Sequence, residues 1–334
     1  MKFGPVPVTQ AEGSVLAHSV SLGARKRLRK GCVLTSSDIA KLQDAGLADV
    51  TVARLDAGDV IEDAAARSLA QALVPDPEGQ FLRFTEAFTG RVNLLAVGPG
   101  VAVLDVPALE AVNRVHPMIT LATVPPFQQM LDGGMVATIK IISYAVPDEA
   151  LAEVCALARK AIRLAPPQLE TVGLIISEIP GGAGSKGRKA IEDRVLAIGL
   201  TMSQPRVVPH HEAALATALK ESTEDLVLIL NGSATSDIDD VAPAALRYAG
   251  GQVARFGMPV DPGNLLFLGS LEKRPVIGLP GCARSPALNG ADWVLSRVIC
   301  GIDVSDDDIA AMAVGGLLKE IPSRPQPRAG KPRE

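Results

Sequence analysis

Apolar residues in the second half of the chain occur in short runs. Helix-forming segments or segments of small polar residues separate these runs. Runs of strand length are TVGLIIS at 171–177, RVVP at 206–209, LVLIL at 226–230 and PVIGLP at 275–280, with FGMPV at 256–260 read as a further strand. Helical segments lie between most of these runs. The alternation predicts an α/β domain with a mostly parallel sheet, helices on both faces and ligands beyond the carboxyl ends of the strands.

Small-residue loops follow three of these runs. NGSATSDIDD at 231–240 precedes a helix signal at Pro243, GCARSP occupies 281–286, and EIPGGAGSKG occupies 178–187. Small residues let backbone N–H groups approach an oxyanion closely, and a helix that begins at the loop adds its positive end. These loops therefore suit a phosphate, although a lone Gly-rich loop is more often an ordinary turn.

The pattern before residue 161 differs from that of the second half. We expect an N-terminal α+β region at 1–75, with a helix capped by Ser36 or Ser37 that leads into a strand. Residues 76–160 alternate as strands do around a helix-like segment at 106–115, which predicts a middle, mostly-β region. The α/β domain then covers 161–305, and the Pro-rich, charged residues 306–334 are expected to be a disordered tail or linker.

Composition narrows the classes of function. The chain has 334 residues, 47% hydrophobic and 21% charged, a net charge of −4 and only ten aromatic residues (seven Phe, two Tyr and one Trp). It lacks the basic surface and stacking side chains that nucleic-acid binding requires. The four cysteines form no CxxC pair, so neither a zinc ribbon nor a disulfide framework is expected. Without an apolar leader or a membrane-length apolar run, we expect a cytoplasmic protein with no membrane partner.

Four segments, in order, resemble the molybdopterin-binding proteins of molybdenum cofactor biosynthesis, the superfamily of molybdopterin molybdotransferases and adenylyltransferases. The segment at 30–52 is similar to the stretch before their cofactor-binding domain, and LVLILNGSATSDIDDVAPAAL is similar to their strand, glycine-rich loop and Asp-bearing helix start. MPVDPGNLLFLG and VIGLPGCARSP are similar to their two later loops. The resemblance implies a three-layer α/β/α molybdopterin-binding domain at 161–305 and assembly as a homo-oligomer.

The resemblance also implies roles for individual residues. Asp237 and Asp240 occupy the acidic positions used for Mg²⁺ or a nucleotide phosphate, and so are the candidate catalytic and metal-binding residues, with Asp240 the stronger candidate. Arg284 is expected to bind a phosphate with two parallel hydrogen bonds. The candidate cofactor-binding residues are Gly181, Gly182, Lys186, Asn231, Gly232, Ser233, Gly263, Asn264, Pro280, Gly281, Cys282, Arg284 and Ser285.

The chain departs from the family pattern at two places. Its loop reads Gly-Ser-Ala-Thr where the family has consecutive glycines, and His210 and His211 stand where an acidic residue is usual. We expect the histidines to lie on the strand-end surface, because adjacent side chains point in different directions and make a poor metal site. Helix capping is the preferred role for Asp239, and a buried structural thiol is at least as compatible with Cys282 as a reactive one.

Two functions remain open on sequence grounds. One is a binding protein that holds molybdopterin, or its molybdenum form, and passes it to a nucleotidyltransferase domain or a molybdoenzyme. The other is a Mg²⁺-dependent molybdopterin adenylyltransferase or molybdotransferase that uses a nucleotide. The departures from the family pattern favour binding over catalysis.

Overall fold

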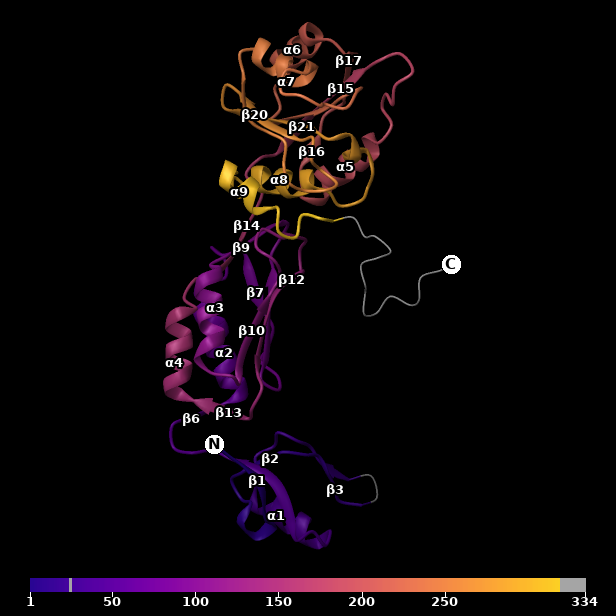
Figure 1. Cartoon of the computed structure of the whole chain (residues 1–334). Coiled ribbons are helices and arrows are strands. Elements are labelled where there is room, and N and C mark those ends of the chain that lie inside the picture. The colour runs from indigo at the N-terminus through magenta and orange to yellow at the C-terminus, as the bar shows by residue number, and fades with distance from the viewer. Residues whose placement is uncertain (24–25, 319–334) are drawn as a thin grey trace. The chain divides into compact units, whose positions relative to one another are not determined.

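The computed structural model describes residues 1–23 and 26–318, and these form a mixed α/β fold (Figure 1). The chain divides into two compact units. The first unit comprises residues 1–98, 102–126 and 132–164, and the second comprises residues 99–101, 127–131 and the chain from Ala165 onward.

The first unit begins with a small antiparallel sheet in the order β1-β5-β2. Its elements are β1 (Lys2–Pro7), the 3-10 turn η1 (Val8–Gln10), β2 (Val15–Leu16), the paired β3 (Val20–Ser21) and β4 (Arg27–Leu28), helix α1 (Ser36–Asp44) and β5 (Asp49–Arg54). The cap of α1 is Thr35, not Ser36 or Ser37 as the sequence suggested. Thr35 accepts the backbone N–H of Asp38, whose carboxylate accepts the Thr35 N–H in return, so this capping box satisfies two N–H groups at once.

The rest of the first unit is a four-stranded antiparallel sheet in the order β10-β12-β8-β7, with helices on one side (Figure 1). Its strands are β7 (Leu82–Phe84), β8 (Arg91–Ala96), β10 (Ile119–Thr123) and β12 (Met135–Ile141), and its helices are α2 (Glu62–Leu73), α3 (Val106–Val115) and α4 (Asp148–Leu157). Ala66, Leu69, Ala70 and Leu73 of α2 are fully buried at helical spacing, so this face of the helix packs into the core.

Short strands between residues 59 and 165 form two further small sheets. They are β6 (Asp59–Ile61), which pairs with β13 (Ala145–Pro147), and β9 (Gly100–Leu104), β11 (Gln129–Met130) and β14 (Ile162–Ala165), which form a sheet in the order β11-β9-β14.

The second unit contains a seven-stranded, mostly parallel sheet in the order β16-β15-β18-β21-β20-β19, with β17 also paired to β15. The strands are β15 (Thr171–Glu178), β16 (Thr201–Met202), β17 (Arg206–Pro209), β18 (Leu226–Leu230), β19 (Gln252–Phe256), β20 (Phe267–Leu271) and β21 (Arg274–Leu279). The pairings among β15, β16, β17, β18 and β21 are parallel, as the sequence pattern predicts, whereas β19-β20 and β20-β21 are antiparallel.

The predicted strand at 256–260 is wrong. Only Phe256 belongs to a strand, and the chain then leaves the sheet before β20. Pro259 lacks the backbone N–H that a sheet ladder needs, which explains why FGMPV does not continue as a strand. No helix separates β19, β20 and β21, so these strands can pair antiparallel.

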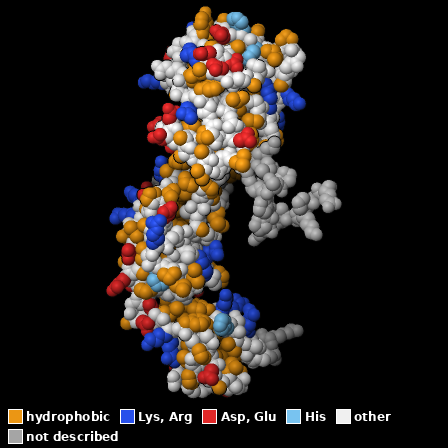
Figure 2. Space-filling model, viewed as in Figure 1, with side chains coloured by type: hydrophobic (Ala, Val, Ile, Leu, Met, Phe, Trp, Pro, Cys, Tyr) orange, Lys and Arg blue, Asp and Glu red, His pale blue; other side chains and the backbone are white. Residues whose placement is uncertain are grey.

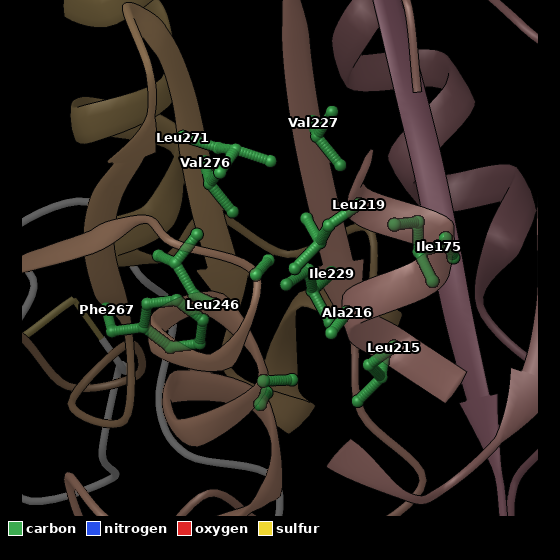
Figure 3. Close-up of a cluster of buried hydrophobic side chains, with 14 residues drawn as sticks. Ile175, Leu215, Ala216, Leu219, Val227, Ile229, Leu246, Phe267, Leu271 and Val276 are labelled. Atoms are coloured by element: carbon green, nitrogen blue, oxygen red, sulfur yellow. The ribbon is translucent and has the colours of Figure 1, made fainter. Parts of the chain in front are cut away.

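Helices α5 (Arg188–Ala197), α6 (Glu212–Glu221), α7 (Val241–Tyr248) and α8 (Gly290–Ile299) accompany this sheet. The buried cluster in Figure 3 joins α6 and α7 to the strands, with Leu219 and Leu246 on the helices and Val227, Ile229 and Phe267 on the strands. Every residue of β18 is buried. Its uninterrupted apolar run is therefore the pattern of a central strand with both faces covered.

The first residues of the predicted tail form a helix. Helix α9 (Asp306–Ala311) is capped by Ser305, which forms a capping box with Asp308, and Ile309 is fully buried. A disordered tail from residue 306 was thus a wrong expectation, because the cap and the buried side chain fix this turn of helix. The remainder of the predicted tail, residues 319–334, lies outside the described residues.

Within the described ranges, no helix is both long and apolar enough to cross a membrane. On the face shown in Figure 2, basic and acidic side chains are interspersed among the described residues.

Candidate functional site

The carboxyl ends of four neighbouring parallel strands meet at one edge of the sheet in the second unit. In spatial order these are β17, β15, β18 and β21. Three predicted loops leave from this edge: the Gly-rich loop (179–187) after β15, the serine loop (231–240) after β18 and the Pro-Gly loop (280–289) after β21. Parallel topology thus brings together segments that lie about fifty residues apart in the sequence.

The guanidinium group of Arg284 connects these three loops. From the Pro-Gly loop, Nη1 donates to the carbonyl oxygens of Gly184 (2.8 Å) and Lys186 (2.5 Å), and Nη2 donates to that of Asn231 (2.8 Å). Burial lowers the pKa of Arg284 below its usual value. Three of its five N–H donors are therefore committed to the protein, and its primary role is to position the loops.

Two glycines permit this close approach. A Cβ atom at Gly187 would lie 2.5 Å from the Cβ of Arg284, and the φ angle of Gly187 is +86°. At Gly232 a Cβ atom would lie 2.8 Å from the carbonyl oxygen of Ser177. Neither position can accept a side chain without moving backbone atoms, so Gly232 is required for packing between the strand ends.

A second arginine holds the Pro-Gly loop from the other side. Arg194 on α5 pairs with Asp292 on α8 and donates to the carbonyl oxygens of Ala283, Ser285 and Ala287 at 2.8–2.9 Å. Arg194 thus occupies three carbonyl oxygens of the Pro-Gly loop, while Arg284 ties the same loop to its two neighbours, so the conformation of the loop is set by protein contacts.

The serine loop presents a row of unused backbone donors. The N–H groups of Ser233, Ala234 and Thr235 donate to no acceptor in the part of the chain that the structure describes. Thr235 is buried, with 5% of its surface exposed. Backbone N–H groups without protein acceptors are donors available to an oxyanion.

His210 lies at this edge as well. The sequence predicted its position at a strand end but not its hydrogen-bond partners. Its Nδ1 lies 2.9 Å from the hydroxyl of Ser177, and its Nε2 lies 2.8 Å from the hydroxyl of Ser233. The neighbouring His211 caps α6 by accepting the N–H of Ala213. The rings of His210 and His211 thus point to different partners, as expected for adjacent side chains. The one sequence signal for His210 was its position directly after a strand.

The aspartates of the serine loop are engaged in local structure. Asp240 is the cap of α7, and its two oxygens accept the N–H groups of Val241 and Ser236. Asp237 accepts the N–H of Asp239, which forms an ion pair with Arg247. Capping, expected of Asp239, is therefore performed by Asp240, because Asp240 directly precedes the first helical residue.

These aspartates do not form a built metal site. Among the described residues, no three His, Cys, Asp or Glu side chains form a group that could hold a metal ion. Each oxygen of Asp240 accepts one backbone hydrogen bond, so the role that the structure gives this carboxylate is that of a helix cap.

The loop with Gly263 and Asn264 packs against the start of α8. Gly290 donates its N–H to the carbonyl oxygen of Pro262, and the Asn264 side chain donates to that of Met258. Burial raises the pKa of the Cys282 thiol, with a smaller contribution from the carboxylate of Asp261. The loop with Gly263 and Asn264 thus joins the segment at 258–264 to the start of α8. Cys282 is partly buried, and all four cysteines are free.

A surface pocket lies beside these loops at the ends of β15 and β17. Its volume is about 660 Å³, and it is lined by residues 178–182, 184 and 207–209. Gly181 and Gly182 lie in its wall. Lys186 is exposed at the end of the same loop and forms no ion pair with another described residue, while Pro280, Gly281 and Ser285 lie on the Pro-Gly loop.

Comparison with known proteins leaves the family open. Residues 5–54 match a family model described as a domain of unknown function, DUF8806. No curated protein sequence matches the chain. One matching solved structure is titled a molybdopterin biosynthesis MoeA protein from Pyrococcus horikosii; it is 13% identical, with 90% of this chain and 75% of that chain covered, at a TM-score of 0.31. A score this low does not establish a shared fold.

Proposed function

We propose that the chain binds molybdopterin, or its molybdenum form, by its phosphate at the strand-end loops of the second unit, and that it takes part in molybdenum cofactor biosynthesis or delivery. The observation that carries the proposal is the row of unused N–H groups at Ser233, Ala234 and Thr235 in a loop that Arg284 joins to its two neighbours. A phosphate has the charge and acceptors to satisfy these donors.

Lys186 supplies the cation in this proposal. Its own carbonyl oxygen accepts from Arg284, which fixes the end of the Gly-rich loop, while its ammonium group is free of ion pairs with the described residues. Gly181 and Gly182 line the adjacent pocket and leave room for a pterin ring beside the phosphate. We further propose that α5 and α8 complete a three-layer α/β/α domain opposite α6 and α7.

Binding rather than catalysis is the better supported activity. In an adenylyltransferase or molybdotransferase of this superfamily carboxylates hold Mg²⁺, whereas the hydrogen bonds of Asp240 and Asp237 are those of a helix cap and a local turn. The ligand would then be passed to a nucleotidyltransferase domain or a molybdoenzyme.

The test is an anaerobic titration of the protein with molybdopterin, repeated with ATP and Mg²⁺ while products are followed by chromatography. Saturable binding without a nucleotidylated product is expected. Lys186→Gln should weaken binding roughly tenfold or more, because a charge-assisted hydrogen bond contributes about 1.5–3 kcal/mol. The matched control is Lys189→Gln, since Lys189 lies one turn away and already pairs with Asp193. Absence of binding would reject the proposal, and product formation would replace the binding role with an enzymatic one.

A further inference from the structure

A chain of hydrogen bonds runs through His210 from a buried to an exposed serine. Ser177 at the end of β15 is fully buried, and its Oγ lies 2.9 Å from Nδ1 of His210. Nε2 of the same ring lies 2.8 Å from the Oγ of Ser233, which is exposed on the serine loop. An exposed hydroxyl, an imidazole and a buried orienting group are the three parts of an activated serine nucleophile.

The surroundings of Ser177 decide the direction of the hydrogen bonds. Its Oγ accepts the N–H of Gly232 at 3.0 Å and lies 3.4 Å from Oδ1 of Asn231. Asn231 is 7% exposed, and among the described residues its Oδ1 has no other donor. Ser177 therefore gives its proton to this buried acceptor and receives Nδ1–H of His210, which leaves Nε2 as the acceptor for the hydroxyl proton of Ser233.

We propose that Ser233 is a nucleophile for acyl transfer from carboxylic esters, a second activity of the loop that the proposed function assigns to pterin binding. Its Oγ bonds to the ester carbonyl carbon while the hydroxyl proton passes to Nε2 of His210. The carbon–oxygen bond to the alcohol then breaks, and the alcohol leaves with that proton. Water hydrolyses the acyl-serine by the same route, with His210 first accepting a proton of the water and then returning it to Ser233.

The unused N–H groups of Ser233 and Ala234 are the donors for the oxyanion that forms on the carbonyl oxygen. The pocket at the ends of β15 and β17 is adjacent in the chain, since its lining residues Glu178 and Pro209 directly follow Ser177 and precede His210. Ile179, Pro180, Val207 and Val208 contribute apolar wall to it. The substrate class is therefore an ester whose acyl group is apolar.

The test treats the full chain with a fluorophosphonate reagent and locates the label by peptide mass spectrometry. Label on Ser233 of the native protein, and its loss after denaturation, is expected. Ser233→Ala should abolish labelling, and His210→Gln should slow it at least about a hundredfold, the usual contribution of a general base. Ser236→Ala is the matched control, because Ser236 lies on the same loop without contact to His210. Labelling elsewhere, or at an equal rate in His210→Gln, would overturn the proposal.

Hydrolysis of p-nitrophenyl butyrate tests Ser177 as a positioning residue. Ser177→Ala should lower the rate of the initial burst, while complete labelling by the fluorophosphonate reagent should reach the same final extent, because that extent counts folded, reactive sites. A loss of this final extent with an unchanged burst rate would show that Ser177 acts only on folding. Molybdopterin titration of the parent protein separates this proposal from the proposed function. Saturable binding without labelling of Ser233 would reject this proposal alone, and labelling of Ser233 without binding would reject the proposed function alone.

Discussion

At the scale of single residues, arginine side chains determine the shape of the candidate site. Arg284 and Arg194 together donate to carbonyl oxygens of the Gly-rich, serine and Pro-Gly loops. The sequence indicated that Arg284 belongs to a phosphate-binding loop, but it did not indicate that most of its donors are occupied by the protein. That information depends on contacts across 53 to 100 residues of chain.

Replacing Arg284 with lysine tests its positioning role. A lysine offers one nitrogen and cannot reach carbonyl oxygens on two other loops, so Arg284→Lys should lower the free energy of unfolding by about 1–3 kcal/mol. Urea unfolding followed by circular dichroism measures the change. Arg247→Lys is the control, because the guanidinium group of Arg247 donates to Ile238 and Asp239 near its own helix. Equal effects of the two substitutions would contradict the role assigned to Arg284.

Two glycines of one loop provide a second residue-scale test. Gly187→Ala should destabilise the protein by more than about 1–3 kcal/mol, because a strained φ is combined with a clash against the backbone of Arg284. Gly181→Ala has a φ of +73° but open space around the new Cβ, so only the strain remains. Thermal unfolding of both variants makes the comparison. A larger loss of stability in Gly181→Ala than in Gly187→Ala would show that the close approach to Arg284 is not what excludes a side chain at Gly187.

At the scale of elements, apolar periodicity predicts well where strands are central and buried. The run 226–230 becomes β18 with every residue buried, and the parallel order of β15, β18 and β21 agrees with their separation by helices. The sequence did not reveal β20, because it joins β21 by a short turn at 272–273 and no helix marks the boundary between the two strands. The helix cap of α1 was displaced by one residue, since adjacent Thr and Ser side chains satisfy the same sequence rule.

The capping box of α1 makes a prediction about pH. Hydrogen bonds from the side chains of Lys41 and Thr35 lower the pKa of Asp38 to about 2. A carboxylate with a depressed pKa stabilises the fold above its unfolded pKa of about 4 and loses that contribution as pH falls toward 2. Asp38→Asn should therefore be less stable than the parent at pH 7, with a difference that shrinks between about pH 4 and 2.

Urea unfolding across this pH range measures the difference. Asp44→Asn at the other end of the helix is the control, because the Asp44 carboxylate has no hydrogen bond or ion pair with a described residue. A stability difference for Asp38→Asn that does not change with pH would contradict the assigned role.

At the scale of the whole molecule, the chain has two compact units and the candidate site belongs to the second alone. The order of strands, helices and small-residue loops in the sequence predicted that the site lies at the carboxyl ends of the parallel strands. The network of Ser177, His210 and Ser233 could not, because it depends on side-chain directions at the ends of three strands that only the folded sheet brings together.

Calorimetry with and without phosphate tests the placement of the site. A ligand that binds one unit raises the unfolding temperature of that unit, by a free energy of RT ln(1 + [L]/Kd). We expect inorganic phosphate to shift the transition of the second unit while leaving that of the first unchanged. Limited proteolysis during heating assigns each transition to a unit, because peptides of the first unit come from the N-terminal part of the chain. A temperature shift confined to the first unit would contradict the placement of the site in the second.

The central claim is that the three strand-end loops hold a phosphate-bearing pterin, and hydrogen exchange of the full chain with and without molybdopterin tests it most directly. Slower exchange in residues 179–187 and 231–240, with the largest change at the N–H groups of 233–235, is the predicted result. Unchanged exchange in both loops at saturating ligand would contradict the account.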